Sequence, residues 1–200
     1  GSRWVRPNYI RYNLLKANDV EADKIFNISS LSYSMALVNE PNYLKGKVTL
    51  EKGDKTGETD ILLDIEDRFP LSIGTSWNNT GRELVGVQRA GLMTSIDNVT
   101  GIGDTLWANN TFASGTYGID TGYTMPLGYR GTKLTFGYSL SDTNLGGAYK
   151  KYDIEGKSHN FSTAVTHPLL KGKNYEINSR LALDSIHSNT TIYGSDDLTK

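Results

Sequence analysis

From Leu71 to Leu183, apolar and polar residues alternate with a period of two, again and again. The clearest row spans residues 133–141, where Leu134, Phe136, Tyr138 and Leu140 alternate with Lys, Thr, Gly and Ser. Similar rows occupy residues 71–77, 86–96, 106–112, 117–127, 161–165 and 175–183. Because successive side chains of a β-strand point to opposite faces of a sheet, the sequence predicts seven amphipathic antiparallel strands.

The two faces of these predicted strands differ in chemistry. One face is apolar, whereas the other carries Gly, Ser, Thr and Asn with isolated charges of both signs: Arg89, Asp120, Lys133, Glu176, Arg180 and Asp184. Strands of roughly ten residues exceed the soluble average of about 5–6 and match the ~9–11 that a transmembrane barrel strand needs. We therefore expect the apolar face, including Leu134, Phe136, Tyr138 and Leu140, to meet lipid, and the six charged residues to line a pore. A soluble β-sandwich alternates in the same way and stays an alternative.

The first part of the chain contains a helical pattern instead. Asn27, or one of the two serines that follow Ile28, can cap a helix in which Leu31, Met35 and Val38 recur at helical spacing. Pro41 ends that helix, because proline lacks the N–H that a helix interior requires. An earlier helix is expected over residues 8–16.

Two shorter strands follow the helix, at residues 45–51 and 60–67, around a turn rich in Gly, Asp and Thr. The chain is therefore predicted to be mainly β with two parts. Residues 3–69 form a small α+β unit, and residues 70–200 form the strand-rich part.

The composition excludes several classes of function. The formal net charge is −1, from 21 basic and 22 acidic residues, which argues against nucleic-acid binding through phosphate neutralisation. The chain has no cysteine, and its 3 histidines lie far apart without metal-ligand spacing. It has no Ser-His-Asp set, acid–base pair or phosphate-binding glycine loop that rises above chance. We expect no enzyme activity, metal, cofactor or nucleotide.

Several motifs occur in an order typical of one family. They are the segment Leu37–Pro41 at the end of the predicted helix, the turn and strand KGDKTGETDILLDIE, the turn DNVTGIGD, the stretch MPLGYRGTKLTFGYSLSDTNLGG, and THPLL. Their order and spacing over about residues 13–185 resemble the transporters of two-partner secretion. These form the hemolysin-activator (ShlB/FhaC-like, TpsB) branch of the Omp85 superfamily. The family's barrel has more strands than the seven predicted here, so the chain is expected to be a fragment.

The resemblance implies a fold and a function. It implies the C-terminal part of a POTRA domain over residues 3–69, in the periplasm, followed by the first strands of a transmembrane β-barrel in the bacterial outer membrane. Such a transporter secretes a large unfolded exoprotein, a TpsA-like hemolysin or adhesin. The POTRA domain is expected to bind this client along a strand edge (Lys47, Thr49 and Glu51) and a helix groove (Leu31, Met35 and Val38).

Four alternatives stay open. The charged residues of the polar face can form mutual salt bridges that stiffen the barrel. The helix residues can simply pack on the sheet of their own unit. The whole chain can be a soluble β-rich adhesin or carbohydrate-binding module. Within the superfamily, it can be a barrel-assembly or translocation factor.

Overall fold

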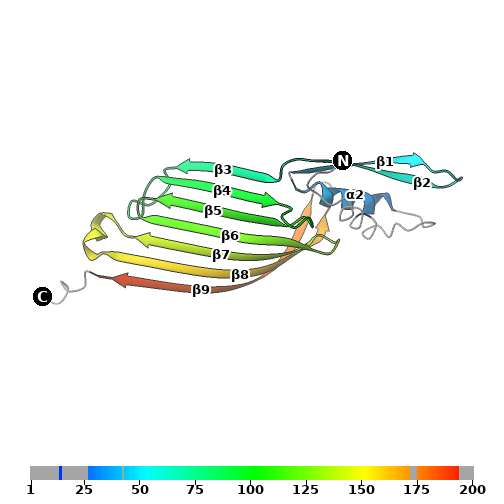
Figure 1. The fold of residues 1–200 in the computed structure, drawn as a ribbon. Coiled ribbons are helices and arrows are strands. Elements are labelled where there is room, and N and C mark those ends of the chain that lie inside the picture. Colours follow the sequence, from blue (N-terminus) through cyan, green and yellow to red (C-terminus); the bar gives the residue numbers. More distant parts are fainter. Residues whose placement is uncertain (1–13, 15–26, 42, 172–174, 194–200) are drawn as a thin grey trace.

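The computed structural model describes residues 14, 27–41, 43–171 and 175–193, drawn in colour in Figure 1. Leu14 is helical and 7% exposed, whereas the rest of the expected helix at residues 8–16 lies outside the described residues. No described helix is long and apolar enough to span a membrane.

The helix–hairpin unit comprises Leu14, α2 (Ile28–Val38), β1 (Leu44–Lys52) and β2 (Thr59–Asp67). Of the three possible caps, the Asn27 side chain caps α2, accepting a hydrogen bond from the backbone N–H of Ser29 at 2.8 Å. The two strands pair antiparallel. Their core is a small cluster of buried residues, Leu14, Leu31, Val38, Tyr43 and Leu44, with Met35, Val48, Leu63 and Ile65 packed against it.

The rest of the described chain forms one seven-stranded antiparallel sheet in which every strand pairs with its neighbour in sequence (Figure 1). Its strands are β3 (Leu71–Asn78), β4 (Arg89–Asp97), β5 (Thr105–Ala113), β6 (Thr116–Leu127), β7 (Thr132–Asn144), β8 (Ile154–Lys171) and β9 (Glu176–Ile192). A strand is present for each of the seven rows of alternation, so the prediction of a mainly β chain with an up-and-down sheet is confirmed. The strand expected from residue 86 begins only at Arg89, because Gly86, with a φ of 107°, belongs to the preceding loop.

The connections alternate between two rims of this sheet. The near rim, next to the helix–hairpin unit, holds residues 98–104 and 128–131 (Figure 1). The far rim holds residues 79–88 and 114–115, and a loop with the short 3-10 helix η1 (Gly147–Tyr152). Far-rim loops bond to one another through the backbone, because the N–H of Gly115 donates to Val85 O at 3.2 Å and that of Gly146 to Leu84 O at 2.7 Å.

The strand register collects the apolar residues on one face of the sheet. Leu71, Ile96, Leu106, Tyr123 and Phe136 form one cross-strand row, and Ile73, Thr94, Ala108, Thr121, Tyr138 and Phe161 form the next. Large side chains on this face are exposed, among them Phe136 at 45%, Phe161 at 62% and Ile73 at 65%. No second sheet covers this face in the described part of the chain. A soluble sandwich would bury such a face, whereas a barrel turns it to lipid.

Candidate functional site

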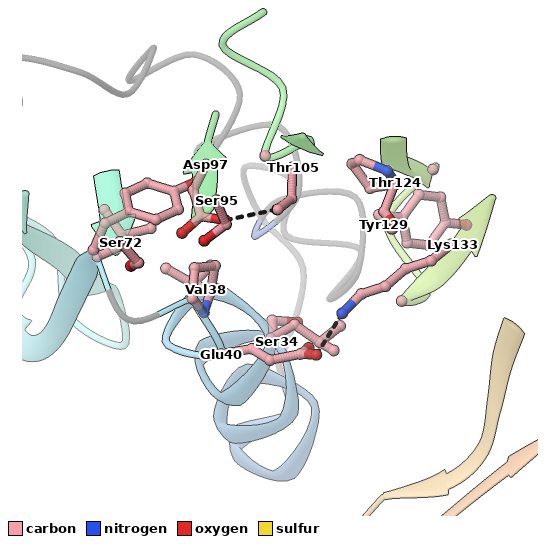
Figure 2. Close-up of a pocket in the computed structure, with 18 residues that line it drawn as sticks. Ser34, Val38, Glu40, Ser72, Ser95, Asp97, Thr105, Thr124, Tyr129 and Lys133 are labelled. Atoms are coloured by element: carbon pink, nitrogen blue, oxygen red, sulfur yellow. Dashed lines mark hydrogen bonds and ion pairs between the residues drawn. The ribbon is translucent and has the colours of Figure 1, made fainter. Parts of the chain in front are cut away.

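The candidate site lies where the C-terminal end of α2 meets the near rim of the sheet. A cavity of about 480 Å³ separates the two, which we call the junction cavity. Figure 2 shows Ser34, Val38 and Glu40 of the helix end on one side, opposite sheet residues on the other. The sheet residues that line it are Ser72, Ser95, Asp97, Thr105, Thr124, Pro126 and Lys133. One wall of the junction cavity is therefore partly apolar, and the other is lined with hydroxyl and charged groups.

One ion pair bridges the junction cavity. The Lys133 ammonium contacts the Glu40 carboxylate, drawn as a dashed line in Figure 2. Both side chains are about two-fifths exposed (40% and 39%), so water screens the pair and its contribution to stability is about 0–1 kcal/mol. The sequence predicts Lys133 to line a pore. The structure places it on the polar face but at the near rim, held by the helix–hairpin unit.

The turn before Lys133 also packs against α2. Gly131 has a φ of +77°, and a Cβ built there would lie 2.9 Å from Pro168 Cγ and 3.2 Å from Leu37 Cδ2. The Tyr33 hydroxyl lies 3.5 Å from the carbonyl oxygen of Arg130 and donates to it. The face of α2 that does not pack on the hairpin is therefore docked on the β6–β7 turn, which fixes the helix–hairpin unit against the near rim.

The environment of Tyr33 reflects this docking. Partial burial raises the pKa of the Tyr33 hydroxyl, and the negative charges of Glu176 and Glu40 raise it further. Because Glu176 is the first residue of β9 and Glu40 follows α2, the tyrosine lies between the two parts of the chain.

The second near-rim turn, residues 98–104, is held by a buried carboxylate. Asp104 is 0% exposed and accepts hydrogen bonds from the Thr100 N–H at 3.0 Å and from the Tyr123 hydroxyl at 2.7 Å. Asn98 has a φ of 58° and accepts from the Gly103 N–H at 2.8 Å. The DNVTGIGD motif thus encodes a rigid turn, in which these polar side chains replace backbone partners.

A second feature of the site is the outer edge of β1. The Asn39 side chain bonds to both backbone groups of Gly46: Gly46 N–H donates to Oδ1 at 2.5 Å, and Nδ2 donates to Gly46 O at 3.0 Å. Gly46 therefore points its backbone groups away from β2. Because the direction alternates along an antiparallel strand, Val48, Leu50 and Lys52 point theirs outward too. These three have no hydrogen-bond partner on that side among the described residues.

The residues predicted to bind a client fall into two groups. Leu31 and Val38 are 6% and 9% exposed, and Met35 packs against the same cluster. Their burial agrees with the alternative that the helix residues pack on the sheet of their own unit. Lys47, Thr49 and Glu51, by contrast, lie exposed along β1, beside the outward-pointing backbone groups. The structure thus brings the strand part of the predicted site to an open edge, but it does not present the helix part.

The six charged residues predicted to line a pore share one face of the sheet but are spread over it. Cross-strand pairs place Arg89 beside Asn78, Asp120 beside Ser139, and Lys133 in a row with Arg180. Asp184 pairs with Ser162 in the same polar face, and Glu176 bonds to Asn178. Leu134, Phe136, Tyr138 and Leu140 lie on the opposite face, where Tyr138 packs on Phe161 with ring centroids 4.8 Å apart.

An aromatic residue on the polar face, Trp107, is not among the site residues predicted from the sequence. Trp107 pairs with Gly122, which in turn pairs with Gly137. A Cβ at Gly122 would lie 2.6 Å from Trp107 Cζ2, so the indole lies directly over the glycine. The signal was available, since Trp107 sits between the apolar-face residues Leu106 and Ala108 and therefore belongs to the other face.

The single up-and-down sheet, with one exposed apolar face and one polar face, defines the class: part of a membrane-spanning antiparallel β-barrel. The family model for the haemolysin secretion/activation proteins ShlB/FhaC/HecB matches residues 57–196. The chain belongs to this family.

Curated relatives and solved structures agree with this assignment. The heme/hemopexin transporter protein HuxB of Haemophilus influenzae strain 86-028NP is 27% identical over 163 residues, covering 77% of this chain and 27% of that protein. HuxB of strain ATCC 51907 is 24% identical over 181 residues, covering 88% and 31%. The chain thus spans about a third or less of these relatives.

The structural neighbours show the same fold. CdiB from Escherichia coli superposes with a TM-score of 0.69 at 18% identity, covering 90% of this chain and 36% of CdiB. BamA from Haemophilus ducreyi lacking POTRA domains 1–3 superposes with a TM-score of 0.64 at 18% identity, covering 94% and 34%. At this identity the neighbours speak for the fold alone. The family match favours the secretion branch over the barrel-assembly branch and over a soluble adhesin.

Proposed function

We propose that this chain is part of an outer-membrane transporter that secretes a large unfolded exoprotein by two-partner secretion. The observation that carries the proposal is the seven-stranded sheet of a secretion family, whose apolar face is exposed and whose polar face continues into the junction cavity. The apolar face contacts the lipid of the outer membrane, and the helix–hairpin unit stands in the periplasm. Transport of this kind needs binding and passage rather than covalent chemistry, so the chain acts without a cofactor or nucleotide.

The client first adds to the open edge of β1 as an extra strand. This mode uses backbone hydrogen bonds for affinity and therefore tolerates many client sequences. The groups it needs are the outward N–H and C=O of Val48, Leu50 and Lys52. The exposed side chains of Lys47, Thr49 and Glu51 flank the added strand.

The client then passes along the polar face of the barrel. Isolated charges of both signs, with Ser, Thr and Asn between them, keep an extended polypeptide hydrated without holding it at one place. Arg89, Asp120, Arg180 and Asp184 supply these charges at different heights of the sheet. Lys133, paired with Glu40, acts at the entrance.

A matched pair of proline substitutions tests the strand-addition step. Leu50 and Ile61 oppose each other in the hairpin, and each points its N–H away from the other strand. Leu50→Pro removes an outward donor of β1, whereas Ile61→Pro removes an outward donor of β2 and serves as the control. The assay is secretion by the full-length transporter in its host. The client is defined as the protein that disappears from the culture medium when the transporter gene is deleted.

We expect Leu50→Pro to reduce the secreted client about tenfold while the transporter level in the outer membrane stays unchanged. Ile61→Pro should leave secretion within about twofold of the parent. Loss of one edge donor weakens client binding by roughly 1 kcal/mol only on the strand to which the client adds. Equal secretion by the two variants would rule out the β1 edge as the client site.

A further inference from the structure

The open edge of β1 has a defined end. At Gly46, the Asn39 amide occupies both the N–H and the C=O that would otherwise extend the edge. A primary amide offers one acceptor and two donors, so it satisfies a backbone residue as a neighbouring strand would. From Val48 onward the outward groups have no partner among the described residues, whereas at Gly46 they are bonded to Asn39. A strand added to this edge can therefore form its ladder up to Val48 but not beyond.

The absence of a side chain at Gly46 makes this contact possible. A Cβ there would lie 3.0 Å from Met35 Cε and 3.2 Å from Val38 Cγ1. Glycine thus lets the end of α2 approach β1 closely enough for Asn39 to reach the backbone. The asparagine is the C-cap residue of α2, with φ −89° and ψ 1°, a conformation that any L-residue adopts. Its amide, rather than its backbone, is therefore the specific requirement.

The edge stops beside the junction cavity. Val38, Glu40 and Pro41, which flank Asn39 in sequence, line this cavity, and so does Leu44 at the start of β1. Across it lie the hydroxyls of Ser95, Thr105 and Thr124 on the polar face (Figure 2). The Thr105 hydroxyl donates to Asp97 at 2.7 Å, and the Thr124 hydroxyl is bonded to that of Thr135 at 3.0 Å. Hydroxyl and carboxylate oxygens on this wall keep acceptor capacity, so it can bind N–H groups of an extended backbone without forming a ladder.

We propose that Asn39 is a positioning residue that ends client pairing along β1 and directs the client into the junction cavity. This inference rests on the proposed function, in which the client adds to β1. The amide prevents the client backbone from pairing with Gly46. The client therefore leaves the edge at a fixed place and meets the hydroxyl-lined wall. Without the amide, the client holds one more residue of the edge and is released more slowly.

The first test is amide hydrogen exchange on the full-length transporter in detergent. The probe is an unfolded fragment of the exoprotein that is lost from the medium when the transporter gene is deleted, chosen from overlapping fragments by its binding to the parent. In the free parent, we expect slow exchange at Gly46 and fast exchange at Val48 and Leu50. The fragment should slow exchange at Val48 and Leu50 and leave Gly46 unchanged. In Asn39→Ala, Gly46 should exchange fast when free and become protected when the fragment binds.

The second test separates positioning from stability. Asn39→Ala should bind the fragment about threefold to tenfold more tightly, because one more residue pairs, and yet secrete less client. A merely structural lesion would weaken both binding and secretion. Asn39→Asp keeps the acceptor for the Gly46 N–H and loses the donor to its C=O, so it should fall between the parent and Asn39→Ala. Adding Leu50→Pro to Asn39→Ala should return the affinity toward that of the parent.

The two levels of the proposal fail in different ways. If the fragment slows amide exchange at neither Val48 nor Leu50 in any variant, strand addition itself is overturned. Protection of these amides together with unchanged or weaker affinity in Asn39→Ala and Asn39→Asp would overturn the role of Asn39 alone. Tighter binding with undiminished secretion would also overturn it, because release would then not depend on the amide.

Discussion

The helix–hairpin unit and the seven-stranded sheet use the same kinds of residue in opposite ways. In the unit, apolar side chains such as Leu31 and Leu44 are 6% and 5% exposed and form a small core. In the sheet, Trp77, Phe136 and Phe161 are 69%, 45% and 62% exposed, on one continuous face. The difference shows that the two parts are built for different surroundings. The unit buries a set of its apolar residues against itself, although Leu50 and Leu62 are exposed, whereas the sheet leaves a whole apolar face uncovered, as expected of a strand face that meets lipid.

The largest effect is expected where a core residue of the unit is truncated. Leu31→Ala should destabilise the helix–hairpin unit by about 2–5 kcal/mol, since the space left in a closed core stays empty. Leu106→Ala, on the exposed face of the sheet, is the matched change and should cost less, because lipid chains fill the vacated space. Native-state hydrogen exchange of the full-length protein in lipid vesicles measures both. Equal losses would show that the two parts are packed alike.

A charge on the apolar face comes next. Phe136→Arg should destabilise the inserted barrel by about 2–4 kcal/mol if the residue lies near the bilayer midplane. Thr135→Arg places the same charge on the polar face of the same strand and should have little effect on insertion. Urea titration of the full-length barrel in vesicles reports the two free energies of unfolding. A larger loss for Thr135→Arg would reverse the assignment of the faces.

Substitutions at two glycines of the β6–β7 turn test the contact between the helix–hairpin unit and the sheet separately from backbone strain. Gly131→Ala combines a positive φ with clashes against Leu37 and Pro168, whereas Gly128 has a φ of +74° and nothing within 4 Å of its Cβ position. Alanine at either position carries backbone strain of about 1–3 kcal/mol. Only Gly131→Ala should also widen the separation between α2 and the near rim, as measured between spin labels on the two. Identical separations in both variants would show that Leu37 does not dock on the turn.

The smallest effect is expected at the ion pair. Glu40→Gln or Lys133→Met should cost less than about 1 kcal/mol at low salt and almost nothing at high salt, because both side chains are partly exposed. The exchanged pair Glu40→Lys with Lys133→Glu should recover the loss. Thermal unfolding at two salt concentrations measures this. A failure of the exchanged pair to recover would mean that Lys133 acts separately from Glu40.

Local pattern was enough to predict the elements of the fold. Period-two alternation placed all seven strands, because each face of the sheet meets a uniform environment along its whole length. The helix followed from its cap at Asn27 and the spacing of Leu31, Met35 and Val38. The same spacing also suggested a client groove. In the structure these residues are buried in the core of the unit or packed against it. Helical spacing alone does not distinguish residues that pack inside a protein from residues that bind a client.

Contacts between distant segments could not be predicted from the pattern. Lys133 reads as one more charge on the polar face, and its partner Glu40 lies 93 positions away in sequence. The Asn39–Gly46 contact depends on how closely a helix end approaches a strand. Trp107 over Gly122 depends on register across two strands. Each of these contacts depends on a distance between segments far apart in sequence, and the spacing of residues within one segment does not predict such a distance.

We propose that one face of the sheet meets lipid and the other meets water. Single spin labels at successive positions 133–140 of the full-length transporter in lipid vesicles test it most directly. Collision with molecular oxygen reports lipid, and collision with a water-soluble nickel complex reports solvent. We expect alternation, with collisions with oxygen dominating at Leu134, Phe136 and Tyr138, and collisions with the nickel complex at Thr135, Gly137 and Ser139. Equal access to the nickel complex at Phe136 and Thr135 would contradict it.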